Sequence, residues 1–293
     1  MFQSCLICTD FTDGLYRFIN CVPSLAQCGL KKIVFFHSAP LWEEGEVPRI
    51  DEEKVELAQQ RLQKALESKT ESIDVQVEVI SGKPLDTIPR VLKKHQIDVI
   101  MVGSPIKTLA QEKVFGSTSA GLAKITSQPL NIIRPELITT YTREELALRS
   151  QHLWRYLLIP YNDSETAHYL IEEIKKYAQN RPENSLQQCM LMSVIDDSGR
   201  RASMMAEQKM KDAEKNLEKV KAELEALDIK VNTFVTTGNP LKAISSAALD
   251  FDISAIAIAT DYRTNIFQWT VRSFANDVMR SSWFPVLLFS PKK

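Results

Sequence analysis

Residues 75–88 read VQVEVISGKPLDTI, and residues 231–244 read VNTFVTTGNPLKAI, 156 positions later in the chain. Each stretch has a strand-like apolar run, a Gly-x-Pro-Leu sequence and an isoleucine three residues further on. Such a run predicts a strand, and the glycine followed by proline predicts a turn into a helix. A strand, turn and helix that recur at a fixed spacing indicate an internal repeat.

The repeat extends beyond these two stretches. The same spacing relates the apolar run 97–102 to the run 253–258. Near the start of each half, a spacing of 152 relates LICTD at 6–10 to LIPYN at 158–162. Two homologous halves are the simplest explanation. We therefore expect one domain over residues 1–135, a linker over 136–152 and a second domain over 153–293.

Each half alternates strand-like and helix-like segments. Apolar runs separated by helices indicate parallel strands that are buried on both faces, so we predict an α/β fold with a doubly wound, Rossmann-like parallel sheet in each half. Pro23 is expected to kink the first helix. Strands are expected near 3–9, 32–38, 74–80, 97–103 and 130–134, and near 154–160, 188–194, 230–236, 254–260 and 285–289.

One predicted helix is unusually long. Between Ala202 and Leu227, apolar residues are spaced alternately by three and four, among many lysines and glutamates. The pattern favours an amphipathic helix that lies on its own sheet. A coiled-coil seam that binds a partner is the alternative, but the stretch is shorter than three to four heptads.

Composition excludes several classes of protein. The 293 residues are 44% hydrophobic and carry a net charge of -1, so no net field attracts the chain to nucleic acid or to an anionic membrane. No apolar run is long enough to span a membrane, and no basic region precedes the apolar run at the start. We therefore expect a cytoplasmic protein that binds neither nucleic acid nor membranes.

The five cysteines suit a reducing compartment. Cys5 and Cys8 form C-x-x-C, but they lie in a predicted strand, where residues three apart point to opposite faces. Buried core thiols are therefore favoured over a redox or metal-binding pair.

Polar residues gather where the strands of the first half are expected to end. In an open parallel sheet, ligands bind beyond these ends, where the strand order reverses. A carboxylate there can accept hydrogen bonds from a ribose, and glycine and hydroxyl residues at a helix start suit an anion, although each feature alone also fits simple helix capping. Together they predict a nucleotide pocket. The candidate residues are Thr9, Asp10, Ser38, Gly103, Ser104, Gly116, Ser117 and Thr118.

Other chemistries fit the sequence less well. Gly82-Lys83 lacks the upstream glycine and the following hydroxyl residue of a P-loop. The sequence contains neither G-x-S-x-G nor H-E-x-x-H, and no Cys/His cluster has the spacing of a metal site. No acid and base pair is visible, so an efficient enzyme is not indicated.

With these motifs, the chain resembles the universal stress proteins, and in particular tandem members with two copies of the domain. The family's nucleotide signature is Gly, two residues, Gly, nine residues, then Gly-Ser/Thr. Gly103 and Gly116-Ser117 match its outer positions, and Ile106 stands at the middle one. Thr9-Asp10-Phe11-Thr12 resembles the family's Asp-bearing turn, so the resemblance implies that Asp10 contacts adenosine and that the main chain of Ser38 contacts adenine.

The resemblance also implies an adenine nucleotide hydrolase-like fold and a function. The expected ligand is ATP or another adenine nucleotide, with or without Mg²⁺, hydrolysed slowly if at all, in a stress-linked sensor or regulator that acts on an unknown protein partner. The final strands of the two halves would pair as an internal pseudo-dimer, and a homodimer could form through outer surfaces.

The second half departs from the family signature. Asn162 replaces the aspartate, and Ala259, Tyr262 and Arg272 stand where glycines are expected. We expect this half to be degenerate and mainly structural. The alternative for the whole chain is a ligand-free scaffold or interaction protein in which side chains close both pockets, a reading that Ile106 and Arg272 favour.

Overall fold

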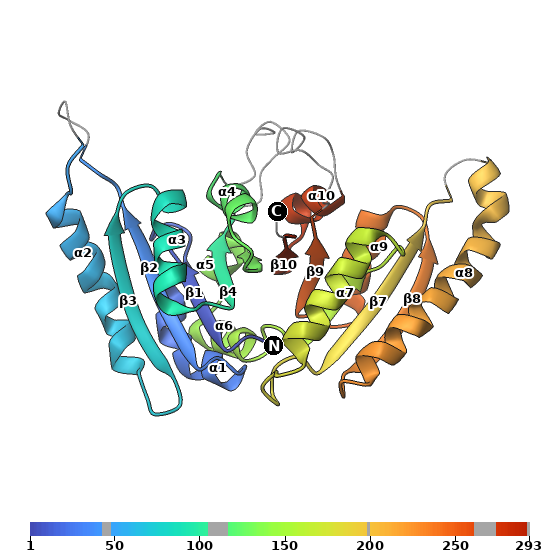
Figure 1. The fold of residues 1–293 in the computed structure, drawn as a ribbon, viewed down its shortest axis with the longest axis horizontal. Coiled ribbons are helices and arrows are strands. Elements are labelled where there is room, and N and C mark those ends of the chain that lie inside the picture. The colour runs from blue at the N-terminus through green and yellow to red at the C-terminus, as the bar shows by residue number, and fades with distance from the viewer. Residues whose placement is uncertain (43–47, 105–116, 198–199, 261–273, 292–293) are drawn as a thin grey trace. The chain divides into compact units, whose positions relative to one another are not determined.

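The computed structural model describes residues 1–42, 48–104, 117–197, 200–260 and 274–291. The chain divides into two compact units, one formed by residues 2–151 and the other by residue 1 with residues 152–293 (Figure 1). Each unit contains five parallel strands and is described here by itself.

The sheet of the first unit reverses its strand order at β1. The order is β3-β2-β1-β4-β5, so the chain adds β2 and β3 on one side of β1 and β4 and β5 on the other. All four pairs are parallel, and β1, β4 and β5 are almost entirely buried, as apolar runs on both faces require. The strands are β1 (Ser4–Cys8), β2 (Lys32–Ala39), β3 (Asp74–Ser81), β4 (Val99–Gly103) and β5 (Leu130–Ile133).

The helices of the first unit follow its strands. Pro23 lies in the first turn of α1, where a missing N–H breaks no helical hydrogen bond, so it begins a helix and does not kink one. The segment expected to be a linker contains α5 and α6. The elements are η1 (Leu15–Cys21), α1 (Val22–Gln27), α2 (Glu52–Gln63), η2 (Lys64–Ser68), α3 (Pro84–His95), α4 (Ser117–Ile125), α5 (Pro135–Thr140) and α6 (Arg143–Gln151).

The second unit repeats this topology. Its strand order is β8-β7-β6-β9-β10, again with the reversal at the first strand, and all its pairs are parallel. Its strands are β6 (Tyr156–Pro160), β7 (Gln188–Ile195), β8 (Lys230–Thr237), β9 (Ala255–Ala259) and β10 (Val286–Phe289). Its helices are α7 (Glu165–Ala178), α8 (Arg200–Glu225), α9 (Pro240–Asp250) and α10 (Phe274–Ser281). The predicted α/β fold with two parallel, doubly wound halves is confirmed.

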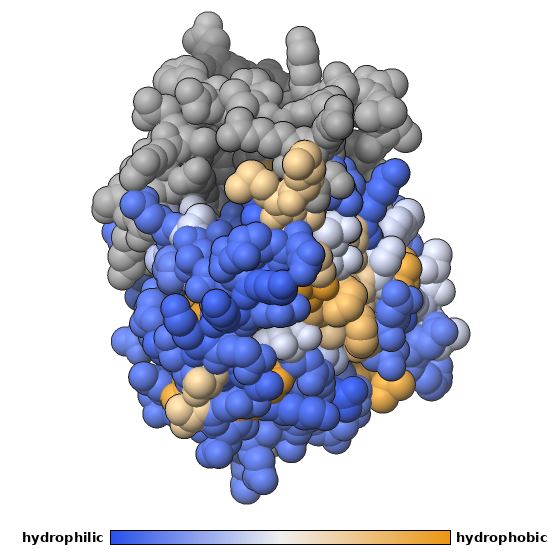
Figure 2. All heavy atoms as spheres, turned by 90° about the vertical axis from the view of Figure 1, so that its right-hand side faces the viewer, coloured by the Kyte–Doolittle hydropathy of each residue, from blue (hydrophilic) through white to orange (hydrophobic). Residues whose placement is uncertain are grey.

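The long helix α8 packs on its own sheet, against β7 and β8. Leu217, Val220 and Leu224 in its C-terminal half are buried, whereas Met204 near its start is 80% exposed. The helix therefore buries an apolar stripe for only part of its length. Figure 2 shows that the side of the second unit that carries α8 is mostly hydrophilic, as a helix rich in lysine and glutamate requires.

The Gly-x-Pro-Leu sequence forms the same turn in both units. Gly82 and Gly238 have φ angles of 140° and 114°, which side chains rarely adopt. Their N–H groups donate to the carbonyl oxygens of Ala39 and Ile195 at 2.9 and 3.0 Å. The prolines lie in the first turn of α3 and α9, where a proline is tolerated. Backbone geometry thus explains why this sequence recurs.

The cysteines are free thiols. Cys5 is buried in β1, and burial raises the pKa of the Cys5 and Cys8 thiols well above the ordinary value. High pKa values disfavour thiolate chemistry at both positions. Within the described ranges, no group of His, Cys, Asp or Glu side chains could hold a metal ion, and no helix is long and apolar enough to cross a membrane.

Candidate functional site

Strand β1 separates from β2 just after Thr9. The Thr9 N–H donates to the Phe36 carbonyl at 3.0 Å, so in a continued ladder the Ser38 N–H would donate to the Thr9 carbonyl. That carbonyl instead accepts a hydrogen bond from Nδ1 of His37 at 2.8 Å, which requires a proton on Nδ1. The ladder between the two strands therefore ends here.

The separation leaves the main chain of Ser38 without a partner on one side. Residues two apart in a strand direct their backbone groups to the same side, so the N–H and C=O of Ser38, like those of Phe36, face β1. Ala39 faces the other way, because its carbonyl accepts from the Gly82 N–H. No described residue bonds to the Ser38 N–H or C=O. A donor and an acceptor thus lie side by side at the point where the strand order reverses.

The loop after β1 is held by the side chain of Asp10. Oδ1 of Asp10 accepts hydrogen bonds from the Thr12 N–H and the Thr12 hydroxyl, each at 2.8 Å, and from the Asp13 N–H at 3.0 Å. Phe11 has a φ of 67°, a left-handed conformation inside this turn. Asp10 is exposed, and no hydrogen bond from the described residues reaches its other oxygen, Oδ2. One carboxylate oxygen builds the loop and the other can accept from a ligand.

Asp13 lies beneath this loop and was missed by the sequence reasoning. Its Oδ1 accepts from the Thr9 hydroxyl at 2.8 Å and from the Leu15 N–H at 2.9 Å. Burial raises the pKa of the Asp13 carboxyl, against the effect of these hydrogen bonds. A Cβ added to Gly103 would lie only 2.9 Å from Cβ of Asp13. Gly103 is therefore required because Asp13 packs directly against it.

Two of the predicted hydroxyl residues have structural roles. The Ser38 hydroxyl donates to the Gly82 carbonyl at 2.7 Å and lies 3.0 Å from the Thr87 hydroxyl, so its side chain fixes the turn into α3. The Ser104 N–H donates to the Ile133 carbonyl at 2.9 Å. The Ser104 carbonyl accepts from the buried guanidinium of Arg134 at 2.8 Å. Burial lowers the pKa of Arg134 to about 10. The main chain of Ser104 is thus occupied.

Phe11 of the loop contacts an aromatic and a cationic side chain. The centroids of the Phe11 and His37 rings are 4.5 Å apart, and Cζ of the Arg61 guanidinium is 4.0 Å from the Phe11 centroid. Such contacts between a cation and a ring are attractive. Arg61 comes from α2, where nothing in the sequence pattern distinguishes it from other solvent-facing charges. It places a fixed positive charge beside the Asp10 loop.

The phosphate end of the predicted pocket is described only in part. Gly116 and Ile106 lie outside the described residues, as do Tyr262 and Arg272 of the second half, and the side chain of Ser117 is not described. Ser117 begins α4, and the half-buried Thr118 follows it in a first turn that contains no acidic residue. Among the candidate residues, Thr9, Asp10 and Gly103 are brought together by their contacts with Asp13, and Ser38 lies next to His37, which bonds to the Thr9 carbonyl.

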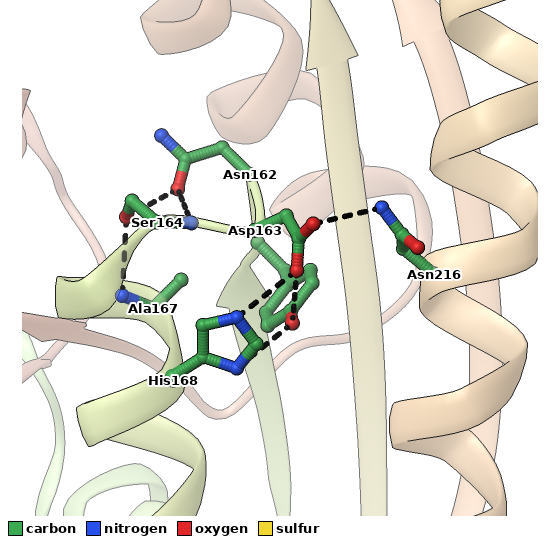
Figure 3. A network of polar contacts seen from close by, with 7 residues as sticks. Asn162, Asp163, Ser164, Ala167, His168 and Asn216 are labelled. Carbon is green, nitrogen blue, oxygen red and sulfur yellow. Dashed lines mark hydrogen bonds and ion pairs between the residues drawn. The ribbon is translucent and has the colours of Figure 1, made fainter.

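The second unit keeps the same turn after its first strand. The Tyr161 N–H donates to the Met192 carbonyl at 2.8 Å, as Thr9 does to Phe36. Oδ1 of Asn162 accepts from the Ser164 hydroxyl at 2.7 Å and from its N–H at 3.4 Å (Figure 3). Asp163 has a φ of 58°, close to that of Phe11. The loop geometry is retained although the aspartate is lost.

Asp163 connects three elements of the second unit (Figure 3). It accepts hydrogen bonds from the Tyr161 hydroxyl at 3.1 Å and from Nδ2 of Asn216, on α8, at 3.0 Å. Nε2 of His168, on α7, lies 3.0 Å from its Oδ1. Burial and the neighbouring Asp163 raise the pKa of the Tyr161 hydroxyl. The network fixes the rim of this site and keeps the tyrosine protonated.

Residues of the second unit line a cavity of about 420 Å³. It lies beyond the carboxyl ends of β6, β7 and β9, between α7, α9 and α10, which is the position expected for a ligand in this fold. Volumes of this size are typical of small-molecule sites. The lining residues are Pro160, Tyr161, Asn162, Ser164, Thr166, Ala167, Leu170, Met192, Val194, Pro240, Ile244, Ile258, Ala259, Phe274 and Ala275.

Known protein structures have the same fold as this chain. No curated protein matches the chain by sequence. The chain is similar over 98% of its length to a crystal structure of a universal stress protein from Archaeoglobus fulgidus DSM 4304, at 18% identity, covering 96% of that chain with a TM-score of 0.66. It is also similar to a protein of unknown function from Pseudomonas aeruginosa PAO1, at 12% identity over 99% of this chain and 93% of that one, with a TM-score of 0.62. These two likenesses show the fold.

The sequence itself settles the family. The profile of the Universal stress protein family matches residues 1–134 and, a second time, residues 154–290. These two matches cover nearly the whole chain and coincide with the two units, whose strands follow the same order. The chain therefore belongs to the universal stress protein family and carries two copies of the family's domain in tandem.

Proposed function

We propose that the first half binds ATP or another adenine nucleotide and that the protein acts as a nucleotide-linked sensor or regulator in a stress response. The observation that carries the proposal is the main chain of Ser38, whose N–H and C=O face the gap left by β1. Adenine presents an acceptor, N1, beside a donor, the N6 amino group. A strand residue with a donor and an acceptor directed to one side matches this edge of the base.

The neighbouring residues suit the rest of a nucleoside. Oδ2 of Asp10 is exposed and can accept a hydrogen bond from a ribose hydroxyl, as acidic residues do in related sheets. The first turn of α4 offers backbone N–H groups and the hydroxyl of Thr118, without a nearby acidic residue on that helix turn. A helix start of this kind favours phosphate groups. Arg61 adds a positive charge beside the loop.

The same site gives little support for rapid hydrolysis. Asp10 and Asp13 are both engaged by the loop, and Asp13 is packed beneath it against Gly103. Asp13, held by these contacts, is therefore a poor candidate for a general base. Mg²⁺, when bound with the nucleotide, would shield the phosphate charges, and slow ATP hydrolysis is the most that we propose. A cytoplasmic location, an internal pseudo-dimer and a further homodimer stay predictions.

Calorimetric titration of the full chain tests the binding proposal. We expect ATP to bind the wild-type chain at one site, in buffer with Mg²⁺ and more weakly with EDTA. Asp10→Asn should weaken binding about 10-fold, which corresponds to roughly 1.4 kcal/mol, since the charge that receives the ribose is lost. The matched control Asn162→Asp changes the equivalent residue of the other half and should leave affinity unchanged. Absence of ATP binding to the wild type would refute the proposal.

The regulatory part of the proposal needs a second experiment. The immobilised wild-type chain, with ATP present, should retain one or more proteins from lysate of stressed cells that it does not retain without ATP. Asp10→Asn should retain the same proteins only at a higher ATP concentration, in proportion to its weaker affinity. Capture of the same proteins with and without ATP would show that partner binding does not depend on the nucleotide, which would refute the regulatory part of the proposal.

A further inference from the structure

The cavity of the second unit differs from the nucleotide site of the first in chemistry. The repeat spacing pairs Val194 with Ser38 and Ala259 with Gly103. It also pairs Phe274 and Ala275 with Thr118 and Ser119. All four second-half residues line the cavity. Hydroxyl groups have thus been replaced by apolar groups at three of the positions that surround the site.

The walls of the cavity are apolar and well ordered by packing. Leu170, Met192, Ile244 and Ile258 are nearly fully buried behind the lining, so the accessible apolar surface comes from the half-buried Val194 and Pro240 and from Phe274, which is 39% exposed. The second half thus keeps a cavity with a mainly apolar lining at the position where ligands bind in this fold.

The polar lining residues follow β6 and begin α7: Tyr161, Asn162, Ser164 and Thr166. Oδ1 of Asn162 is occupied by Ser164, which leaves the Nδ2 amide as a donor with no partner among the described residues. Figure 3 shows this nitrogen directed away from Ser164. Asp163 beside it and Glu165 in the first turn of α7 contribute negative charge. The rim thus offers a hydrogen-bond donor and repels anions.

We propose that the second half binds a small, uncharged amphiphile, with an alkyl chain in the cavity and a carbonyl acceptor at Nδ2 of Asn162. A medium-chain ketone or amide has this chemistry, because it buries an apolar chain against Val194, Pro240 and Phe274 and presents one neutral acceptor at the rim. A nucleotide does not, since Phe274 stands where the first half offers the Thr118 hydroxyl to the phosphates. The two halves would then bind two different ligands.

Fluorescence of N-phenyl-1-naphthylamine, an uncharged apolar probe, tests the site in the full chain. We expect saturable binding to one site, displacement by 2-decanone or decanamide, weaker displacement by decanoate, and none by ATP. Val194→Trp should fill the cavity and weaken probe binding at least 10-fold. The control Leu249→Trp adds the same ring at a residue of α9 that is 70% exposed and should leave the probe affinity unchanged.

A second variant keeps the test decisive if Val194→Trp unfolds the domain. Asn162→Ala changes an exposed rim residue and should weaken decanamide about 10-fold, while the probe, which has no carbonyl, binds as before. Asp10→Asn should affect neither ligand, so failure of this proposal and failure of the nucleotide proposal are distinguishable. Non-saturable probe fluorescence, equal affinity in both tryptophan variants, or displacement of the probe by ATP would overturn the inference.

Discussion

Asp10 and Asn162 hold the same turn in the two halves. Oδ1 of Asp10 accepts from the Thr12 hydroxyl at 2.8 Å, and Oδ1 of Asn162 accepts from the Ser164 hydroxyl at 2.7 Å. In both turns the following residue has a positive φ. An amide oxygen therefore builds this turn as well as a carboxylate does. The negative charge of Asp10 is not needed for the fold, which leaves it available for a ligand.

The first prediction separates the turn from the charge. Asp10→Asn should change the free energy of unfolding by less than about 0.5 kcal/mol, because the amide oxygen keeps the hydrogen bonds to Thr12. Asp10→Ala should destabilise the first unit by about 1 kcal/mol, because the Thr12 and Asp13 N–H groups lose their acceptor. Urea unfolding of both variants measures the difference. Equal destabilisation by Asn and Ala would show that the charge itself holds the turn.

The second prediction uses the two glycine turns as a matched pair. Gly82→Ala and Gly238→Ala both force a side chain into a positive φ, at a cost of about 1–3 kcal/mol. A Cβ at Gly82 would also lie 3.1 Å from Cγ2 of Thr87, whereas at Gly238 it would meet nothing within 4 Å. Gly82→Ala should therefore be the more destabilising of the two in thermal unfolding. If Gly238→Ala were the more destabilising, the contact with Thr87 would not determine the difference between the two turns.

The third prediction concerns the contact between Gly103 and Asp13. Gly103→Ala should destabilise the first unit by about 1–3 kcal/mol, because its Cβ would lie 2.9 Å from that of Asp13. In an Asp13→Gly background this cost should fall, since the opposing Cβ is absent. A double-mutant cycle in urea measures the coupling. Additive effects of the two substitutions would show that the contact between the added Cβ and Asp13 does not cause the destabilisation.

The sequence was sufficient for the topology and for part of the site. The repeat at Gly82 and Gly238 and the apolar runs predicted all ten strands, because buried parallel strands and glycine turns leave strong local patterns. Asp10 and Gly103 lie at strand ends, as the sequence predicts, because the sheet places such residues, and their role in binding stays a prediction.

Other features depend on contacts that no local pattern encodes. Asp13 reaches Gly103 only because the loop turns at Phe11, which adopts a positive φ that its residue type does not suggest. Arg61 meets that loop from α2 across a long connection. The cavity of the second half was missed because the changes at Asn162 and Ala259 were judged against a nucleotide signature, and only packing shows that a mainly apolar lining surrounds a space.

The last prediction is a pH dependence that comes from Asp13. Burial raises the pKa of its carboxyl in the folded state, so between the unfolded and folded pKa values the folded chain binds more protons. Stability therefore falls as pH rises through this window, and the loss remains at neutral pH. Asp13→Asn should unfold at a higher urea concentration than the wild type at pH 7, and at the same concentration at pH values below the unfolded pKa.

Asp51→Asn is a control with the opposite expected effect. Hydrogen bonds from Lys54 lower the pKa of Asp51, so the Asp51 carboxylate stabilises the fold above its unfolded pKa. The variant should therefore be less stable than the wild type at pH 7. A constant difference between Asp13→Asn and wild type across this pH range would show that the carboxyl does not titrate with folding.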